Sequence, residues 1–180
     1  MEISEKVKRA KSQKPKANSQ HKLYLGLGTN LGDREAHIRK AVSLIGERVG
    51  KVLRLSSLIE TEPWGFDSPN KFLNAVLLCE TTKTPREVLL LTQQIERDMG
   101  RTQKSQAISD WPLAVDSKPK ANSQQPTANS QRPTYKDRPI DIDILRYDDI
   151  TVDEPDLKIP HPLMLERDFV MIPYNEVKEV

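Results

Sequence analysis

Strand-like and helix-like segments follow one another in an order that few folds share. Apolar residues alternate or run together in the strand-like segments and recur every three to four residues in the helix-like ones. In chain order these segments are strand 23–27, helix 33–47, strands 52–61 and 72–81, helix 84–100 and strand 138–145. This βαββαβ order predicts an α+β, ferredoxin-like fold, with an antiparallel sheet and helices on one face. A C-terminal loop and a short helix around 164–169 should extend it.

The ends of both helices carry residues that start or stop a helix. Thr84-Pro85-Arg86-Glu87 has the capping-box pattern, with proline at the first helical position. Gly50 and Gly100 follow the two apolar stripes and predict where the helices end.

Three copies of a short polar phrase mark segments that should not join the core. Pro-Lys-Ala-Asn-Ser-Gln occurs at 15–20 and 119–124, and Pro-Thr-Ala-Asn-Ser-Gln occurs at 126–131. Such segments bury too little apolar surface to offset the entropy lost on ordering. We therefore expect a flexible tail at 1–21 and a single domain at 22–180, with a low-complexity insertion at about 106–134.

Charge and composition argue against several kinds of partner. The 180-residue chain has a net charge of +2, so no global basic surface favours nucleic acid or a membrane. No apolar stretch approaches the ~20 residues of a membrane span, and the N-terminus has no apolar signal core. Cys79 is the single cysteine, which excludes a disulfide framework. We expect a cytoplasmic protein with Cys79 in its core.

The predicted strand 138–145 has two carboxylates on one face and three isoleucines on the other. Because side chains alternate along a strand, Asp141 and Asp143 should project the same way, roughly 7 Å apart. Mg²⁺ takes one or two carboxylates and leaves its other positions to water and phosphates. Arg138 lies just upstream and supplies a guanidinium that suits phosphate. The alternative is a half-buried edge strand with a solvated acidic face.

Two other segments are typical of ligand sites, and each has a second interpretation. Gly26-Leu-Gly28-Thr-Asn-Leu-Gly32 joins a strand to a helix, either as a dinucleotide-binding loop or as a tight turn that a substrate can approach. Phe72 and Asn74 share one strand face and offer a stacking plane beside an amide, as a flat heterocycle needs. Phe72 is otherwise a core residue.

Several motifs, taken in order, resemble the 6-hydroxymethyl-7,8-dihydropterin pyrophosphokinase family. They are Leu-Gly-Thr-Asn-Leu at 27–31, Thr-Glu-Pro-Trp-Gly at 61–65, Phe-Leu-Asn-Ala at 72–75, Gln-x-x-Glu at 93–96, Gly-Arg at 100–101, Arg-x-x-Asp-Ile-Asp at 138–143 and Pro-His-Pro at 160–162. The resemblance implies a Mg²⁺-dependent diphosphotransferase that moves the β,γ-diphosphate of ATP to the pterin hydroxymethyl group. The products would be AMP and the pterin diphosphate of folate biosynthesis.

The resemblance also implies a role for each matching residue. Asp141 and Asp143 would hold two Mg²⁺ ions and act in catalysis with Arg101 and Arg138. The residues implied to bind ATP are Gln93, Glu96, Arg101, Lys104, Arg138, Ile144, Lys158, His161 and Arg167. Those implied to bind the pterin are Gly28, Thr61, Glu62, Pro63, Trp64, Phe72, Asn74 and Phe169. The partners would be these small molecules, without nucleic acid or membrane, and other folate-pathway enzymes would be candidates for association.

Three departures from the family pattern bear on the site. Lys136-Asp137 stands directly before Arg138, where the family usually has glycine and proline. Gln103 stands where many members have a second loop arginine, and Lys104 is the candidate substitute. The insertion falls in the loop that, in the family, closes over the nucleotide.

Two other functions fit the same predicted fold. A ferredoxin-like sheet also serves RNA-binding modules, which require exposed aromatic and basic residues on the sheet. Aromatic residues make up 5% of this chain, and its last core strand carries two aspartates, which argues against RNA. A non-catalytic scaffold that binds partners through the insertion is the other alternative.

Overall fold

The computed structural model describes residues 19–64, 66–101 and 136–179. Its elements are β1 His21–Thr29, α1 Arg34–Arg48, β2 Lys51–Leu55, β3 Ile59–Thr61, β4 Phe72–Thr81, α2 Pro85–Asp98, β5 Asp141–Tyr147, β6 Val152–Glu154, β7 Leu157–Ile159, a 3₁₀ helix Met164–Glu166 and α3 Asp168–Val177. Lys104, the expected insertion and residues 1–18 of the expected tail lie outside the described residues.

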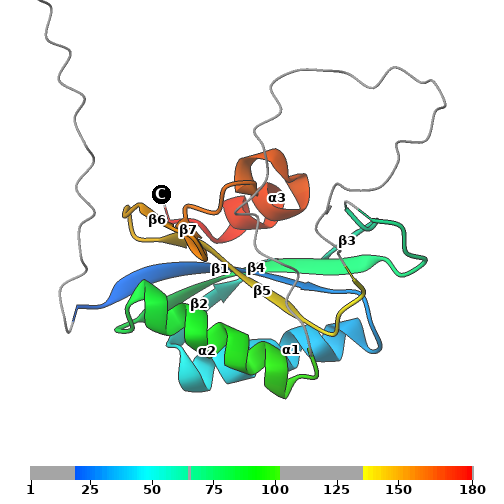
Figure 1. Ribbon diagram of the computed structural model, residues 1–180, viewed down its shortest axis with the longest axis horizontal. Coiled ribbons are helices and arrows are strands. Elements are labelled where there is room, and N and C mark those ends of the chain that lie inside the picture. Colours follow the sequence, from blue (N-terminus) through cyan, green and yellow to red (C-terminus); the bar gives the residue numbers. More distant parts are fainter. Residues whose placement is uncertain (1–18, 65, 102–135, 180) are drawn as a thin grey trace, which may run out of the picture.

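The main sheet is antiparallel and has the strand order β2-β4-β1-β5, with β3 also paired to β4 (Figure 1). β1 lies in the middle and pairs with β4 on one side and β5 on the other. This topology confirms the predicted ferredoxin-like fold. It also rules out the dinucleotide-binding interpretation of Gly26–Gly32, because that motif needs a parallel βαβ unit.

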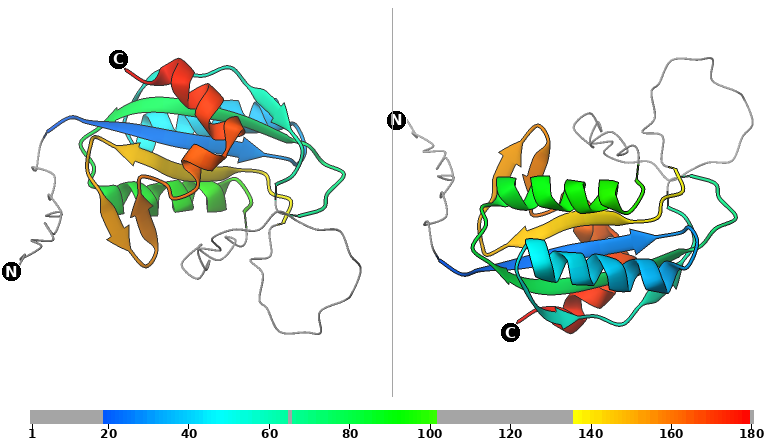
Figure 2. Two further views of the ribbon diagram at one scale, coloured as in Figure 1. Left: turned by 90° about the horizontal axis from the view of Figure 1, so that it is seen from above. Right: turned by 90° about the horizontal axis from the view of Figure 1, so that it is seen from below.

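Each face of the sheet has its own hydrophobic cluster. On one face α1 and α2 pack side by side and bury a cluster that includes Leu25, Ile45, Cys79, Ile95 and Ile142 (Figure 2). On the other face α3 covers a smaller cluster that includes Tyr24, Val76, Leu145 and Tyr174. Both faces of the central strands are therefore buried along part of their length. Cys79 lies in the core, as the sequence predicted.

Both predicted helices begin at side-chain caps. Asp33 accepts a hydrogen bond from the backbone N–H of Ala36 at 3.0 Å and starts α1. Thr84 and Glu87 form the predicted capping box at the start of α2. Such caps satisfy backbone N–H groups that would otherwise lack partners.

A bulge in β5 changes which of its residues point to each face of the sheet. The register with β1 shifts between Tyr24 and Leu25, so Leu145 has no partner on β1. Before the bulge, Ile142 and Ile144 belong to the cluster under α1 and α2, whereas Leu145 belongs to the cluster under α3. Asp141 and Asp143 therefore share the α3 face, as the alternation predicted.

The structure differs from the prediction in two places. The predicted strand 52–61 is split into β2 and β3. Leu55 pairs with Leu77 and Ile59 pairs with Asn74, so this segment advances four residues where β4 advances three, and the strand pairing is interrupted. The C-terminal region holds the β6–β7 hairpin, and its main helix is α3, which begins near the end of the predicted helix.

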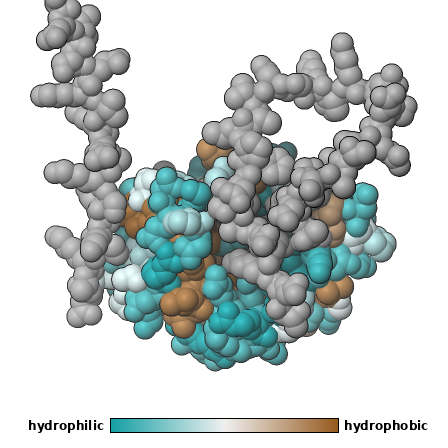
Figure 3. All heavy atoms as spheres, viewed as in Figure 1, coloured by the Kyte–Doolittle hydropathy of each residue, from teal (hydrophilic) through white to brown (hydrophobic). Residues whose placement is uncertain are grey.

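The visible surface of the described part is mostly hydrophilic, with hydrophobic residues in small separate patches (Figure 3). In the described ranges, no helix has both the length and the apolar character needed to cross a bilayer.

Candidate active site

A cavity lies on the α3 face of the sheet, between β1, β4 and β5 and the segments that precede β4 and α3. It holds about 700 Å³ of empty space, part of it open to solvent, which suits a small molecule. The predicted site residues that line it are Gly28, Thr61, Glu62, Trp64, Phe72, Asn74, Arg138, Asp141, Asp143, His161, Arg167 and Phe169. Residues far apart in the sequence thus meet as the motifs predicted.

One half of the cavity is aromatic. Phe66 meets Phe72 edge-on, with ring centroids 6.1 Å apart. The guanidinium carbon of Arg138 lies 5.0 Å from the Phe72 ring centroid. That of Arg167 lies 4.4 Å from the Trp64 ring centroid and 5.7 Å from that of Phe169. These ring faces already hold flat cationic groups, so their geometry suits stacking with a planar ligand.

An amide stands beside these rings. Asn74 donates from Nδ2 to the Thr61 hydroxyl at 2.8 Å, which fixes the orientation of its amide. Its Oδ1 faces Gly28, where an added Cβ would lie only 3.2 Å away. The cavity needs glycine here because a side chain would press on Asn74. The pairing of β3 with β4 places Thr61 next to Phe72.

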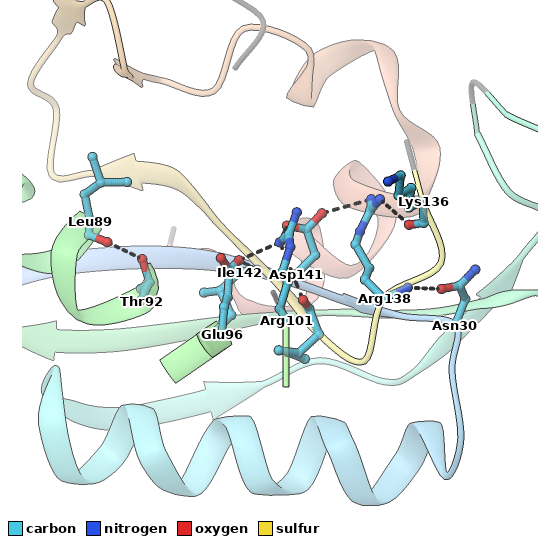
Figure 4. Close-up of polar contacts among 10 residues, drawn as sticks. Asn30, Leu89, Thr92, Glu96, Arg101, Lys136, Arg138, Asp141 and Ile142 are labelled. Carbon is cyan, nitrogen blue, oxygen red and sulfur yellow. Dashed lines mark hydrogen bonds and ion pairs between the residues drawn. The ribbon is translucent and has the colours of Figure 1, made fainter. Parts of the chain in front are cut away.

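The other half of the cavity is charged. Arg101 forms an ion pair from Nη1 to Oδ1 of Asp141, and Arg138 forms one from Nη2 to Oδ2 at 2.9 Å (Figure 4). The Asp143 side chain lines the cavity on the same face, and among the described residues its carboxylate has no hydrogen-bond or ion-pair partner. The two aspartates therefore differ: one is engaged on both oxygens, and the other faces the cavity.

Arg101 and Glu96 lie behind this half rather than in its lining. They are 6% and 2% exposed, and Arg101 donates to Glu96 Oε1 at 2.8 Å. Burial alone would lower the pKa of Arg101, but the negative charges of Asp141 and Glu96 outweigh burial and raise it. Arg101 therefore stays charged inside the protein.

Arg138 is held by a loop that is anchored through its backbone. Its N–H donates to Oδ1 of Asn30 at 2.8 Å, and the N–H of Asn30 donates back to the Arg138 carbonyl at 3.2 Å. The carboxylate of Asp137 accepts from the amides of Asn30 at 2.7 Å and Asn70 at 2.9 Å. Asp137, which departs from the family pattern, thus ties the loop before Arg138 to two other loops.

The carboxylates fit a magnesium ion that phosphates help to hold. In the described part of the chain, no group of three or more His, Cys, Asp or Glu side chains gathers as a metal site. Asp141 and Asp143 would therefore give a metal ion the carboxylate oxygens of two side chains, and no third described side chain of these types would join them. That is the share of the coordination shell that protein usually gives Mg²⁺ in nucleotide sites, where phosphates and water fill the rest.

The remaining predicted residues lie elsewhere. Ile144 is buried in the core under α1 and α2, so only its backbone is available to a ligand. Lys158, on β7, pairs with Asp153 outside the cavity lining. Neither Pro63 nor Gln93 is among the residues that line the cavity.

Sequence reasoning missed several lining residues, among them Gly26, Phe66 and Val170. Phe66 lies in a turn-rich loop between Glu62 and Asn70, where no periodicity indicates which way a side chain points. Gly26 pairs with Asp143 across β1 and β5, and that register could not be read from the sequence. In the sequence, the one indication was that Gly26 is a glycine within a strand, which often marks a place where a ligand approaches the backbone closely.

Comparisons with known proteins identify the family. The 7,8-dihydro-6-hydroxymethylpterin-pyrophosphokinase (HPPK) family matches residues 24–117 and 120–179. A 2-amino-4-hydroxy-6-hydroxymethyldihydropteridine pyrophosphokinase of Porphyromonas gingivalis is 42% identical over 156 residues, which cover 86% of this chain and 89% of that protein. The protein of the same name from Bacillus subtilis is 33% identical over 155 residues, 86% of this chain and 76% of its own length.

The fold also matches a solved structure. A crystal structure described as HPPK-DHPS in complex with substrates aligns with a TM-score of 0.59 at 14% sequence identity. The match covers 88% of this chain and 40% of that one. Because the sequence identity is so low, the match bears on the fold alone. The family match and the two relatives confirm what the ordered motifs predicted: the chain belongs to the 7,8-dihydro-6-hydroxymethylpterin-pyrophosphokinase family.

Proposed function

We propose that this protein transfers the diphosphate of ATP to the hydroxymethyl group of 6-hydroxymethyl-7,8-dihydropterin, giving AMP and the pterin diphosphate. Its family makes it a pyrophosphokinase of folate biosynthesis that uses ATP as co-substrate. One observation carries the assignment of the site: a single cavity joins an aromatic half that bears an amide to a half with two aspartates and an arginine.

The pterin belongs in the aromatic half. Phe72 and Phe169 offer ring faces, and Asn74 offers an amide oxygen beside Gly28. A pterin ring is flat and carries hydrogen-bond donors and acceptors on its edge, so it needs both features. Thr61, Glu62, Pro63 and Trp64 would complete the contacts, partly through their backbone.

Mg²⁺ and the ATP phosphates belong in the charged half. Asp141 and Asp143 would hold Mg²⁺ there, and two ions are our proposal from the family pattern. When bound, the metal would neutralise phosphate charge and lower the pKa of the attacking hydroxyl. Of the groups in the cavity lining, Arg138, His161 and Arg167 would neutralise the negative charge of the transferred diphosphate. Gln93, Lys104 and Lys158 remain predictions for the nucleotide.

Asp143→Asn tests the assignment because it preserves size and removes the negative charge. AMP formation, followed by ³¹P NMR, should fall on the order of 100-fold or more, since a catalytic metal contributes several kcal/mol. Asp149→Asn is the matched control, because this exposed aspartate pairs with Arg146 and does not line the cavity. Wild-type turnover in folded Asp143→Asn would remove Asp143 from the metal site.

The two alternative functions are not favoured. The sheet face that an RNA-binding module would use is covered by α3 and carries Asp141 and Asp143. Association with another folate-pathway enzyme and a cytoplasmic location both remain predictions. Co-sedimentation with the next enzyme of the pathway, at several salt concentrations, would test the association.

A further inference from the structure

Glu96 is buried behind the cavity, whereas a residue that contacts the nucleotide would be expected in the cavity lining. It lies in the last turns of α2, is 2% exposed and does not line the cavity. The resemblance had implied ATP binding, yet the carboxylate is turned toward the edge of the sheet, next to β5 (Figure 4). A buried carboxylate at a sheet edge needs hydrogen-bond donors there.

The first donor is the backbone of the strand that carries the aspartates. The N–H of Ile142 donates to Oε1 of Glu96 at 2.8 Å. Ile142 lies between Asp141 and Asp143, and β5 is an edge strand of the sheet. The hydrogen bond therefore fixes the backbone at the point from which both aspartates project.

The second donor is a side chain that also holds Asp141. Nη1 of Arg101 donates to the same Oε1 of Glu96 at 2.8 Å and forms the ion pair with Asp141. The Arg101 and Glu96 side chains are 4% and 3% exposed, so this pair is shielded from water. A hydrogen bond to a charged group in such surroundings is strong and directional.

We propose that Glu96 is a positioning residue, whose buried carboxylate sets the orientation of Asp141 and Asp143 by holding the Ile142 backbone and Arg101 together. It touches neither metal nor nucleotide. The role rests on the proposed function, since the two aspartates are positioned for Mg²⁺ and phosphate. Groups that bind metal ligands in this way commonly change metal affinity by roughly 10- to 100-fold when removed.

Two substitutions separate positioning from a contact with ATP. Glu96→Gln keeps an oxygen that can accept from Ile142 and Arg101, whereas Glu96→Ala removes both hydrogen bonds. Gln94→Ala is the matched control, because Gln94 is exposed on the same helix and bonds to its helix neighbours Asp98 and Arg97.

The first measurement is metal binding. Mn²⁺ is titrated, with electron paramagnetic resonance, into full-length protein saturated with an ATP analogue whose α,β-bridging oxygen is a methylene. Glu96→Ala should weaken Mn²⁺ binding by roughly 10- to 100-fold. Glu96→Gln should recover most of the loss, and Gln94→Ala should match the wild type. Affinity for the analogue without metal should be unchanged in all three variants.

The second measurement reports on the backbone directly. Amide hydrogen exchange at Ile142, in protein free of metal and nucleotide, should accelerate in Glu96→Ala but not in Gln94→Ala. This result does not depend on the enzyme's reaction, and it can be obtained in any variant that folds.

Each failure has a distinct meaning. Absence of metal binding by the wild-type protein with analogue would overturn the proposed function. Wild-type metal affinity in Glu96→Ala, with Ile142 exchange unchanged, would overturn only the positioning role. A loss of metal-free analogue affinity in Glu96→Ala, equal to the loss with metal, would make Glu96 a nucleotide contact instead.

Discussion

Arg138 and Asp141 form an ion pair across the charged half of the cavity, with Nη2 2.9 Å from Oδ2. Arg101 binds the other oxygen of the same carboxylate. A metal ion that uses Asp141 must therefore compete with two guanidinium groups. ATP phosphates offer those guanidinium groups other partners, so metal and nucleotide should enter the site together.

Removing Arg138 should therefore have opposite effects on metal binding and on turnover. In Arg138→Ala, Mn²⁺ should bind the nucleotide-free protein about tenfold more tightly, because a charge-assisted hydrogen bond to Asp141 worth about 1.5 kcal/mol or more is lost. AMP formation should fall, since the arginine no longer neutralises phosphate charge. Paramagnetic resonance of Mn²⁺ and ³¹P NMR measure the two effects.

Arg54→Ala is the control for this prediction, because Arg54 is exposed on β2, away from the cavity lining. It should change neither quantity. Unchanged or weaker Mn²⁺ affinity in nucleotide-free Arg138→Ala would show that the ion pair does not compete with metal.

Gly28→Ala should damage the pterin half of the cavity without affecting the phosphate half. The new methyl group would lie 3.2 Å from Oδ1 of Asn74 and 3.7 Å from the Phe72 ring. Displacing these groups costs about 1–3 kcal/mol in a packed site, so pterin affinity should fall on the order of tenfold or more. Calorimetry with the pterin and, separately, with the methylene ATP analogue would reveal a selective effect. Equal losses for both ligands would contradict this division of the cavity.

Gly50→Ala should destabilise the whole domain. An added Cβ would clash with the Glu80 carbonyl oxygen and lie 3.0 Å from both the carbonyl carbon of Glu80 and Cα of Thr81. Since these atoms belong to β4 at the centre of the sheet, the backbone cannot give way cheaply. We expect the free energy of unfolding in urea to fall by about 3 kcal/mol or more.

Gly46→Ala is the contrasting substitution for stability. Gly46 lies inside α1, and among the described residues outside that helix an added Cβ would meet only Val52, at 3.9 Å. Alanine loses less conformational entropy in a helix than glycine, so stability should rise by about 0.5–1 kcal/mol. A loss of stability in Gly46→Ala as large as that in Gly50→Ala would show that crowding at Glu80 is not the cause.

The sequence predicted those parts of the fold that depend on local patterns. The alternation in β5 placed Asp141 and Asp143 on one face, and the capping box at Thr84 placed the start of α2, because both signals lie within a few neighbouring residues. The motif order then indicated which residues would meet. Phe72, Asn74 and Arg138 do line one cavity with the two aspartates.

Other features depend on contacts that no local pattern encodes. The split between β2 and β3 comes from their register against β4. Glu96 and Gln93 lie on the same side of a helical wheel, yet only Glu96 accepts a hydrogen bond from the Ile142 N–H. The packing of α2 against the sheet decides which of the two does so. The family pattern offered no role for Asp137, whose partners Asn30 and Asn70 lie far away in the sequence.

Asp137 should make the loop before Arg138 sensitive to acid. A hydrogen bond from Ser68 lowers the pKa of Asp137, burial opposes that shift, and bonds from Asn30 and Asn70 lower the pKa further. Because the folded-state pKa is depressed, the stabilisation is present above the unfolded value of 3.8 and is lost as pH falls through the folded-state pKa.

Asp137→Asn tests this role of the carboxylate. In the wild type, Asn30 and Asn70 donate to the two different oxygens of Asp137, whereas an asparagine side chain has one acceptor oxygen. We expect a loss of about 1 kcal/mol in unfolding free energy at pH 6, shrinking below pH ~4. Urea unfolding across that range measures it, with exposed Asp149→Asn as control, and a difference that grows toward low pH would refute the role.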